Sequence, residues 1–310
     1  MTSLTSPTPT DRPAPTDADR IARLRDAAYR IRRYALDMGE VQGQGYIGQA
    51  LGVADVLAVL FGDVLRFRPH DPEWPQRDRF LLSIGHYAIA AYAAFAEAGI
   101  IPAEELETYG SDDSRLPMSA MASYTPGMEI SGGSLGHGLG VATGMALGLR
   151  HLGNPARVVN LLSDGELDEG STWEAAMSCA HHGLSNVLAV VDVNGLQADG
   201  PTAGVLRIDP LEDKWRAFGW AVRRVDGNDV AALVAAADEL TADPTAPSVL
   251  LCDTRPGRGV PMLETREKAH FLRVEEHEWQ TARDQLLAGD ITTSTPIGER
   301  SPTIQEGHTR

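Results

Sequence analysis

Five short apolar runs, separated by stretches with helical spacing, constrain the fold of this chain more than any other feature. Helical patterns at 87–98, 138–151, 171–182 and 229–240 lie between them. Nearly continuous apolar strands that alternate with helices indicate a parallel sheet covered on both faces. We therefore predict an α/β fold of this kind. The runs are RFLLS (79–83), RVVNLLS (157–163), NVLAVVDV (186–193), WAVRRVD (220–226) and SVLLCD (248–253).

The chain is predicted to form one domain between two tails. An amphipathic helix is predicted near 21–35, where Ile21, Leu24, Ala28, Ile31 and Ala35 recur at helical spacing, and ADVLAVLFGDVL predicts a second. The segment 99–132 reads as loop and short helix. Residues 1–16 and 291–310 are rich in Thr, Ser and Pro or otherwise polar, so they are predicted to be disordered tails around a domain at 17–290.

Charge and cysteine content exclude several classes of function. The chain has 27 basic and 43 acidic residues, a net charge of −16, and no dense basic run, which disfavours a nucleic-acid partner. Cys179 and Cys252 form no CxxC pair, so neither a disulfide framework nor a zinc site is indicated. The N-terminus lacks the apolar region of a signal peptide, and Glu97 interrupts the apolar stretch around AIAAYAAFAEAGII. We expect a cytoplasmic protein without a membrane partner.

The stretch SDGELDEGSTWEA, 163–175, concentrates carboxylates where a predicted strand ends. Ligands of a parallel sheet bind at the carboxyl ends of its strands, where Asp164 and, after the next strand, Asn194 are expected to converge. With a backbone carbonyl from the turn NGLQADG, they supply the oxygen ligands that Mg²⁺ or Ca²⁺ takes. A lone Asp-Gly after a strand is more often a simple turn. Ser171 is the predicted N-cap of the following helix.

The spacing of Asp164 and Asn194 resembles the thiamine-diphosphate enzymes, in which Gly-Asp-Gly is followed by Asn after about thirty residues. Ser163 replaces the first glycine and Val193 stands where a second Asn is common, but neither position supplies a metal ligand. SGGSLGHGLGVATGMALG resembles the transketolase turn Gly-x-Leu-Gly-Gln-Gly, with His137 in place of Gln. RDRFLLSIGHYAIAAYA resembles the Ser-x-Gly-His segment of the same family. Further blocks match in the same order, VVDVNGLQADG, FGWAVRRVDGND and DTRPGRGVPMLE.

The resemblance covers about residues 20 to 275 and implies a thiamine-diphosphate-binding fold with particular site residues. It implies metal ligation by Asp164, Asn194 and the carbonyl of Leu196. Catalytic roles are implied for His86, Glu169 and His270. The residues implied to contact the cofactor are His86, Gly133, Ser134, Leu135, Gly165, Asn194 and His270.

Two of these assignments have simple structural alternatives. Glu169 matches the family glutamate that bridges toward the opposing active site, but a first-turn Glu is also favoured by the helix dipole. His270 matches the family's late histidine near the substrate, whereas a lone His in a polar stretch is more often a surface residue. His181, His182 and His277 fit helical surfaces and receive no role.

The match extends over only part of a complete transketolase, which continues into a pyrimidine-binding domain and a third domain. The resemblance therefore implies the N-terminal subunit of a split transketolase that transfers a two-carbon ketol unit from a ketose to an aldehyde. The expected partner is a C-terminal subunit, in an α2β2 assembly. Two alternatives remain, the alpha subunit of a 2-oxo-acid dehydrogenase or other decarboxylase, and a non-catalytic subunit with a vestigial pocket.

Two family histidines that reach the donor hydroxyls are missing from the sequence. Tyr46 stands at the position of one, in GQGYIGQALG, and Ser119 or Ala120 is near the place of the other. One interpretation is that Tyr46 or the partner chain supplies the lost hydrogen bonds. The other is a changed substrate, because a site built to bond a hydroxyl discriminates strongly against molecules that do not fill it.

Overall fold

The computed structural model describes residues 16–242, 244–266 and 269–289. The tails predicted at 1–16 and 291–310 lie outside these residues, except for Thr16. Thr16 caps the first helix, because its side chain accepts from the backbone N–H of Asp19 while the Asp19 carboxylate accepts from the Thr16 N–H.

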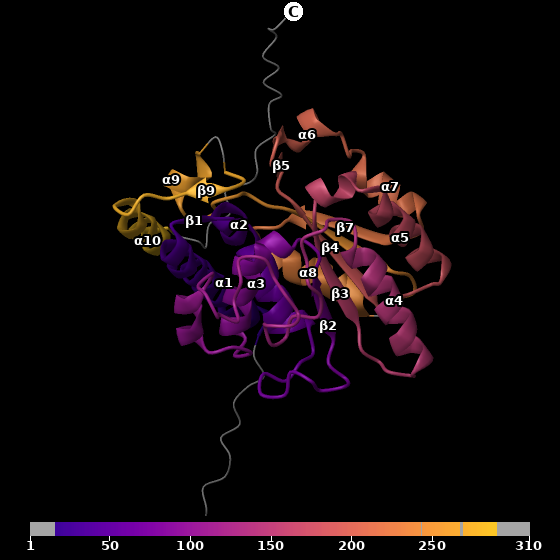
Figure 1. Ribbon diagram of the computed structural model, residues 1–310. Coiled ribbons are helices and arrows are strands. Elements are labelled where there is room, and N and C mark those ends of the chain that lie inside the picture. Colours follow the sequence, from indigo (N-terminus) through magenta and orange to yellow (C-terminus); the bar gives the residue numbers. More distant parts are fainter. Residues whose placement is uncertain (1–15, 243, 267–268, 290–310) are drawn as a thin grey trace, which may run out of the picture.

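The centre of the fold is a sheet of five parallel strands in the order β2-β3-β4-β8-β7 (Figure 1). Each strand lies within one of the five predicted apolar runs, so the prediction of a parallel α/β sheet is confirmed. The strand order follows the chain from β2 to β4 and then reverses, because β8 lies between β4 and β7 and β7 forms the far edge. The strands are β2 Arg79–Leu82, β3 Val158–Ser163, β4 Val187–Val193, β7 Ala221–Asp226 and β8 Ser248–Asp253.

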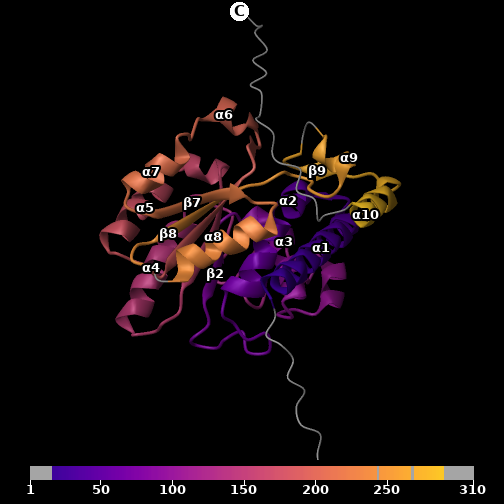
Figure 2. The same ribbon diagram turned by 180° about the vertical axis from the view of Figure 1, so that it is seen from behind.

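Helices cover both faces of the sheet, as the apolar strands require. Val159 and Leu161 of β3 pack into one core with α1, α2, α3 and α8, whereas Val158 and Leu162 pack into a second core with α4, α5 and α7. Figure 2 shows α8 lying over the sheet on the face away from α4. The bounds are α1 Asp17–Gln42, α2 Ile47–Val59, α3 Ala88–Glu97, α4 Gly138–His151, α5 Gly170–His181, α7 Leu211–Ala217 and α8 Val230–Ala242.

The second helix begins earlier than its amphipathic pattern predicts. α2 starts at Ile47, directly after Tyr46, and continues into a π-helical turn, Leu60–Val64. Gly48 and Gly52 lie within this extra part of the helix and allow close packing, because a Cβ at either position would lie within 3 Å of a backbone carbonyl oxygen. The span Ile47–Val64 is long and apolar enough to cross a membrane, but 89% of it is buried inside the fold. It is a core helix here.

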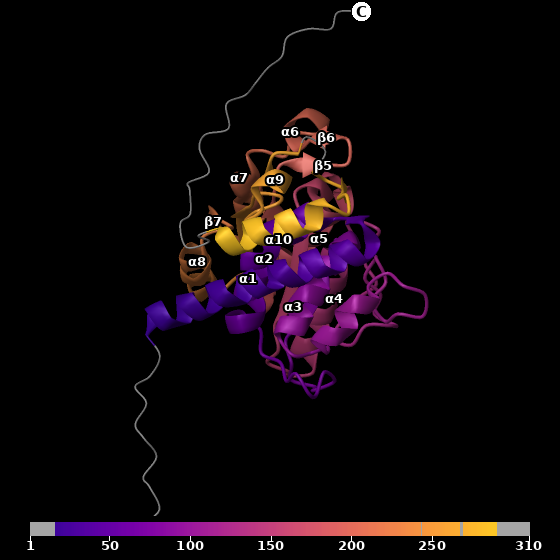
Figure 3. The ribbon, with the colours of Figure 1, turned by 90° about the vertical axis from the view of Figure 1, so that its left-hand side faces the viewer.

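Short elements surround the carboxyl edge of the sheet. Figure 1 shows β5 and α6 above the sheet on one side, with β9 and α9 above it on the other. β1 pairs with β9 and β5 with β6, both antiparallel, and α10 lies along α1 (Figure 3). The bounds are β1 Gln44–Gly45, η2 Gly85–Tyr87, η3 Ala103–Thr108, η4 Gly165–Asp168, β5 Leu196–Gln197, β6 Gly200–Pro201, α6 Thr202–Val205, α9 Pro261–Glu264, β9 Leu272–Arg273 and α10 Glu278–Ala288.

Candidate functional site

Asp164 lies at the carboxyl end of β3 and is almost fully buried, with 1% of its surface exposed. Its carboxylate accepts hydrogen bonds from the N–H of Gly165 at 2.9 Å, the N–H of Gly195 at 2.6 Å and the hydroxyl of Thr202 at 3.1 Å. Burial, together with the nearby Asp192 carboxylate, raises the pKa of Asp164 to about 7. A nearby cation would stabilise the charged form of a carboxylate that is buried in this way.

Asn194 leaves the next strand, β4, at the same edge, as the sequence predicted. Its amide nitrogen donates to Asp192 and to the Tyr87 hydroxyl, both at 2.9 Å, and its oxygen accepts from the Leu196 N–H at 2.9 Å. Asp192 also accepts from Tyr87 at 2.8 Å and from Thr254. These bonds fix the orientation of the Asn194 amide. The Gly195 N–H that reaches Asp164 links the two strand ends, and so does the Asp164 N–H, which donates to the carbonyl of Asp192 at 2.9 Å.

A second buried carboxylate, Glu166, connects the strand end to the glycine-rich turn. It is fully buried and accepts hydrogen bonds from the Ser83 hydroxyl and from the Gly136 N–H, the latter at 2.8 Å. The Ser83 hydroxyl in turn accepts from the Gly138 N–H, at the start of α4, at 3.0 Å. Burial raises the pKa of Glu166 to about 7. Glu166 thereby joins η4, the segment Ser-Ile-Gly-His at 83–86 (the SIGH segment) and the first turn of α4.

The glycine-rich turn, residues 131–137, passes very close to the SIGH segment. A Cβ atom on Gly132 would lie 2.6 Å from the Cα of Gly85, and one on Gly85 would lie 2.3 Å from the carbonyl carbon of Gly132. No side chain fits at either position. Gly133 and Ser134 are exposed and Leu135 is partly exposed, so this turn presents its backbone at the carboxyl edge, where an anionic group can reach N–H donors.

His86 and His270 are far apart in sequence but adjacent in the structure. Their ring centroids are 5.9 Å apart, and Tyr46 contacts both, at 4.5 Å from His86 and 5.4 Å from His270. Burial, with a smaller contribution from His270, lowers the pKa of His86 to about 4, and burial also lowers the pKa of His270. Both rings are therefore neutral near pH 7. His270 is partly buried, so the solvated-surface alternative is wrong.

A cavity of about 500 Å³ opens beside this aromatic group. It lies between the segment that follows Asn194 and the segment that carries His270. Its size suits a small ligand. The residues that line it are Tyr46, Leu196, Gln197, Ala198, Asp199, Gly200, Pro201, Ala269, His270 and Phe271.

The other sequence predictions have mixed outcomes. Glu169 is exposed and directly precedes α5. Ser171 is not the N-cap, because α5 begins at Gly170 and the Ser171 hydroxyl donates to the carbonyl of Gly136 at 3.0 Å. Ala120 is buried beside the SIGH segment, and its N–H donates to the carbonyl of Gly85 at 3.0 Å. The histidines that received no role, His181, His182 and His277, are exposed.

Several buried residues of the site were not predicted from the sequence. Asp192 and Glu166 could have been found, since each is a carboxylate within or next to an apolar run. Tyr87 and Gln49 could not, because tyrosine and glutamine are common in ordinary helices and their presence indicates no site. Gln49, on α2, has 1% of its surface exposed, and its amide nitrogen lies 3.1 Å from Nδ1 of His270.

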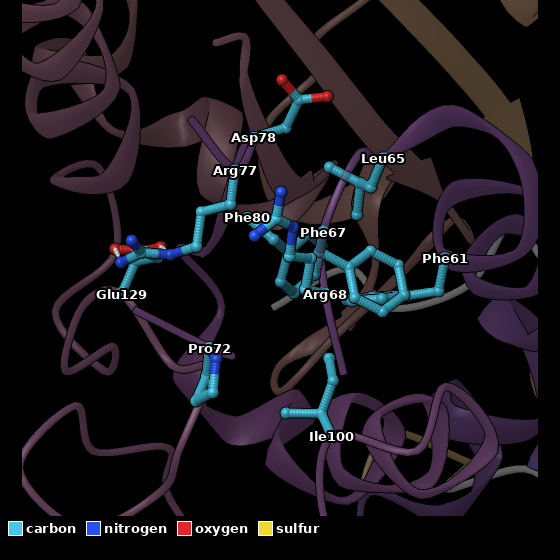
Figure 4. Close-up of a pocket in the computed structure, with 11 residues that line it drawn as sticks. Phe61, Leu65, Phe67, Arg68, Pro72, Arg77, Asp78, Phe80, Ile100 and Glu129 are labelled. Atoms are coloured by element: carbon cyan, nitrogen blue, oxygen red, sulfur yellow. Dashed lines mark hydrogen bonds and ion pairs between the residues drawn. The ribbon is translucent and has the colours of Figure 1, made fainter. Parts of the chain in front are cut away.

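A second, much smaller cavity lies at the opposite, amino edge of the sheet. Its volume is about 30 Å³, room for a water molecule or two but not for a substrate-sized ligand. Figure 4 shows the Arg77 guanidinium directed at Glu129 and away from the rings of Phe61 and Phe67. The Arg77–Glu129 ion pair has an N–O distance of 3.0 Å. We assign no ligand to this cavity because it is too small for one.

Comparison with known proteins identifies the family. Residues 24–291 match the thiamine diphosphate binding domain of transketolase. The chain belongs to the transketolase family. The predicted resemblance and the thiamine-diphosphate-binding fold are therefore confirmed.

The relatives include subunits of about the same length and much longer transketolases. The chain is 64% identical over 267 residues to a transketolase family protein of Sinorhizobium fredii, covering 86% of this chain and 96% of that protein. It is 37% identical over 263 residues to the 6-deoxy-6-sulfo-D-fructose transketolase subunit of a Clostridium strain, covering 85% and 96%. The structure of transketolase from Leishmania mexicana superimposes with a TM-score of 0.80 at 26% identity. That match covers 88% of this chain but only 43% of the longer transketolase.

Proposed function

We propose that this chain is the diphosphate-binding subunit of a two-component transketolase that transfers a two-carbon ketol unit. The observation that carries the proposal is the convergence of Asp164 and Asn194 at the carboxyl edge of a thiamine-diphosphate-binding domain. Similarity to a transketolase subunit of nearly the same length supports the two-component form.

The residues at this edge fit a divalent cation. Asp164 and Asp192 are buried close together, and among the described residues no Lys or Arg forms an ion pair with either. Such buried charge calls for a cation. We assign the ion, Mg²⁺ or Ca²⁺, to Asp164, the side-chain oxygen of Asn194 and the carbonyl of Leu196. These are the hard oxygen donors that both ions prefer.

The diphosphate is assigned to the glycine-rich turn and the first residues after Asp164. Gly133, Ser134 and Leu135 present exposed or partly exposed backbone there, and Gly165 is partly exposed beside Asp164. When bound, thiamine diphosphate supplies the centre that carries the two-carbon unit. The chain's own groups hold the diphosphate and metal and exclude water. His86 and His270, neutral near pH 7, donate or accept hydrogen bonds without adding positive charge to the site.

A partner subunit completes the site in this proposal. Val141 and Met177 are 40% and 56% exposed on the adjacent helices α4 and α5. Gly140 and Gly144, on the same exposed side of α4, have no atom within 4 Å of a Cβ position. Such an apolar face with small residues suits close helix packing, and Glu169 stands at one end of it. We therefore assign this face to the contact between subunits in an α2β2 assembly, in the cytoplasm.

The substrate is proposed to differ from the ordinary phosphosugars. Tyr46 replaces a family histidine and packs against His86 at 4.5 Å between ring centroids. Its aromatic ring also lines the cavity of about 500 Å³. The Clostridium relative, a subunit of about this length, is named for 6-deoxy-6-sulfo-D-fructose, and this supports the proposal. We propose a ketose donor or aldehyde acceptor outside the xylulose 5-phosphate and ribose 5-phosphate pair.

The test is reconstitution with the partner subunit. The purified chain alone is expected to show no ketol transfer, and activity is expected on mixing. The substrate proposal is tested by kcat/KM for xylulose 5-phosphate with ribose 5-phosphate against a panel of other ketoses and aldehydes. Full turnover by the isolated chain would overturn the two-component proposal, and preference for the ordinary pair would overturn the substrate proposal.

A further inference from the structure

The first turn of α2 contacts the segment that carries His270 in two ways. Gly48 approaches its backbone, since a Cβ on Gly48 would lie 2.8 Å from the carbonyl oxygen of Ala269. Gln49, the next residue, places its amide nitrogen 3.1 Å from Nδ1 of His270. The segment 269–271 lines the cavity at the carboxyl edge, so the start of α2 determines where one wall of that cavity lies.

The Gln49 contact also determines which nitrogen of His270 carries the proton. The structure turns the amide nitrogen of Gln49, and not its oxygen, toward Nδ1, so in this orientation Nδ1 accepts, and a neutral imidazole that accepts at Nδ1 is protonated at Nε2. Gln49 is almost fully buried and does not line the cavity, whereas His270 does. The Nε2–H group is then the polar group of His270 that remains available to a ligand in the cavity.

We infer that Gln49 is a positioning residue, which together with Gly48 holds His270 as a hydrogen-bond donor through Nε2. This inference rests on the proposed function for its catalytic consequence, but the hydrogen bond itself does not depend on that function. A donor in this place can bond a carbonyl or hydroxyl oxygen of a sugar and cannot accept from one. Gln49 acts through His270 and is not itself assigned a contact with substrate.

The first test is the protonation pattern of His270 by ¹H–¹⁵N NMR of the full chain with labelled histidine. The resonance is identified by its loss in His270→Asn. In the wild type, Nε2 is expected to carry the proton. In Gln49→Glu, the carboxylate accepts, so the proton is expected to move to Nδ1. A wild-type His270 protonated at Nδ1 would overturn the inference.

The second test is kinetic and uses matched control variants in the assembled enzyme. Gln49→Met is expected to lower kcat about tenfold with little change in KM, the effect of losing one positioning hydrogen bond. Gln42→Met is the control, because it removes a similar bond, 2.8 Å to the carbonyl of Tyr109, from the end of α1. Equal kcat for Gln49→Met and wild type, with an unchanged His270 resonance, would contradict the positioning role.

The glycine contact has its own matched pair. Gly48→Ala and Gly52→Ala each add a methyl group on the same helix, at 2.8 Å and 2.9 Å from a backbone carbonyl oxygen. Only the first carbonyl, that of Ala269, belongs to the His270 segment, so only Gly48→Ala is expected to shift the His270 resonance and lower kcat. Identical behaviour of the two variants would overturn this part. If the wild-type complex transfers no ketol unit, the proposed function fails, and the NMR result alone decides the hydrogen bond.

Discussion

The two edges of the sheet both bury carboxylates but balance their charge differently. At the amino edge, Asp78 accepts from the Arg66 guanidinium at 2.9 Å and from the Arg157 N–H at 2.7 Å, and Glu129 pairs with Arg77. At the carboxyl edge, Asp164 and Glu166 bond only to N–H and hydroxyl groups among the described residues.

The difference indicates what each edge is for. A buried carboxylate that is paired with an arginine has its charge balanced within the fold, so that removing either partner is costly. One without a basic partner is costly until a cation or proton joins it. The carboxyl edge therefore keeps an unbalanced charge where the glycine-rich turn also presents N–H donors, and the cavity of about 500 Å³ opens on that side. The following predictions test this contrast, from the largest expected effect to the smallest.

Asp78→Ala is expected to destabilise the fold by about 3 kcal/mol, because it leaves the backbone N–H groups of Arg66 and Arg157 without their acceptor and removes the partner of both guanidinium groups. Urea denaturation of the chain measures the loss. Cofactor affinity of the folded protein should not change, since Asp78 is at the edge away from the site. A large loss of affinity at unchanged stability would show that the two edges do not have separate roles.

The stability contributed by His86 is expected to depend on pH. Its pKa is lowered from 6.5 to about 4, so in this range the unfolded chain binds more protons than the folded one. Stability from this group is present above pH 6.5 and is lost as the pH falls to about 4, by about 3 kcal/mol in total.

Comparison with His86→Gln isolates this contribution. The free energy of unfolding of wild type minus that of His86→Gln should fall as the pH drops through this window. The exposed His181 gives the control variant His181→Gln. A difference between wild type and His86→Gln that does not vary with pH would show that the ring is not buried as the structure has it.

Asp164→Asn is expected to weaken binding of thiamine diphosphate with Mg²⁺ at least about a hundredfold, or about 2.7 kcal/mol. The substitution removes the negative charge that we assign to binding the cation, but it keeps a polar side chain of the same size. Without cofactor, the variant should lose less stability than Asp78→Ala near pH 7, because removing a buried charge that lacks a basic partner offsets the acceptor oxygen that the amide cannot replace.

Calorimetry on the reconstituted complex measures the affinity for wild type and Asp164→Asn. Equal affinities would contradict the site assignment. If Asp164→Asn instead lowered the stability of the cofactor-free chain as much as Asp78→Ala, the contrast between the two edges would fail.

Much of this fold could be predicted because its signals are local. The five strands appear in the sequence as apolar runs, and Asp164 and Asn194 could be placed at one edge because parallel strands end together. The start of α2 could not be predicted. Glycines such as Gly48 and Gly52 usually weaken a helix, and only the structure shows the backbone carbonyls that pack against them. Contacts across long sequence separations, such as Gln49 with His270, leave no pattern in a single sequence.

The last prediction compares two buried serines, one at each edge. The Ser83 hydroxyl donates to Glu166 and accepts from the Gly138 N–H, so Ser83→Ala leaves two buried groups short of a partner. A loss of about 1–2 kcal/mol in the free energy of unfolding is expected. Cofactor affinity should also fall, because the turn before α4 loses an attachment.

Ser248, at the start of β8, is the matched control for Ser83. It is 3% exposed, against 1% for Ser83, and its one side-chain hydrogen bond among the described residues is a long contact of 3.5 Å to the carbonyl of Leu240. Ser248→Ala is expected to cost less than about 0.5 kcal/mol and to leave cofactor affinity unchanged. Denaturation and calorimetry on both variants give the comparison. Equal effects would mean that the Ser83–Glu166 connection contributes no more than ordinary packing, and that the carboxyl edge is organised by its backbone alone.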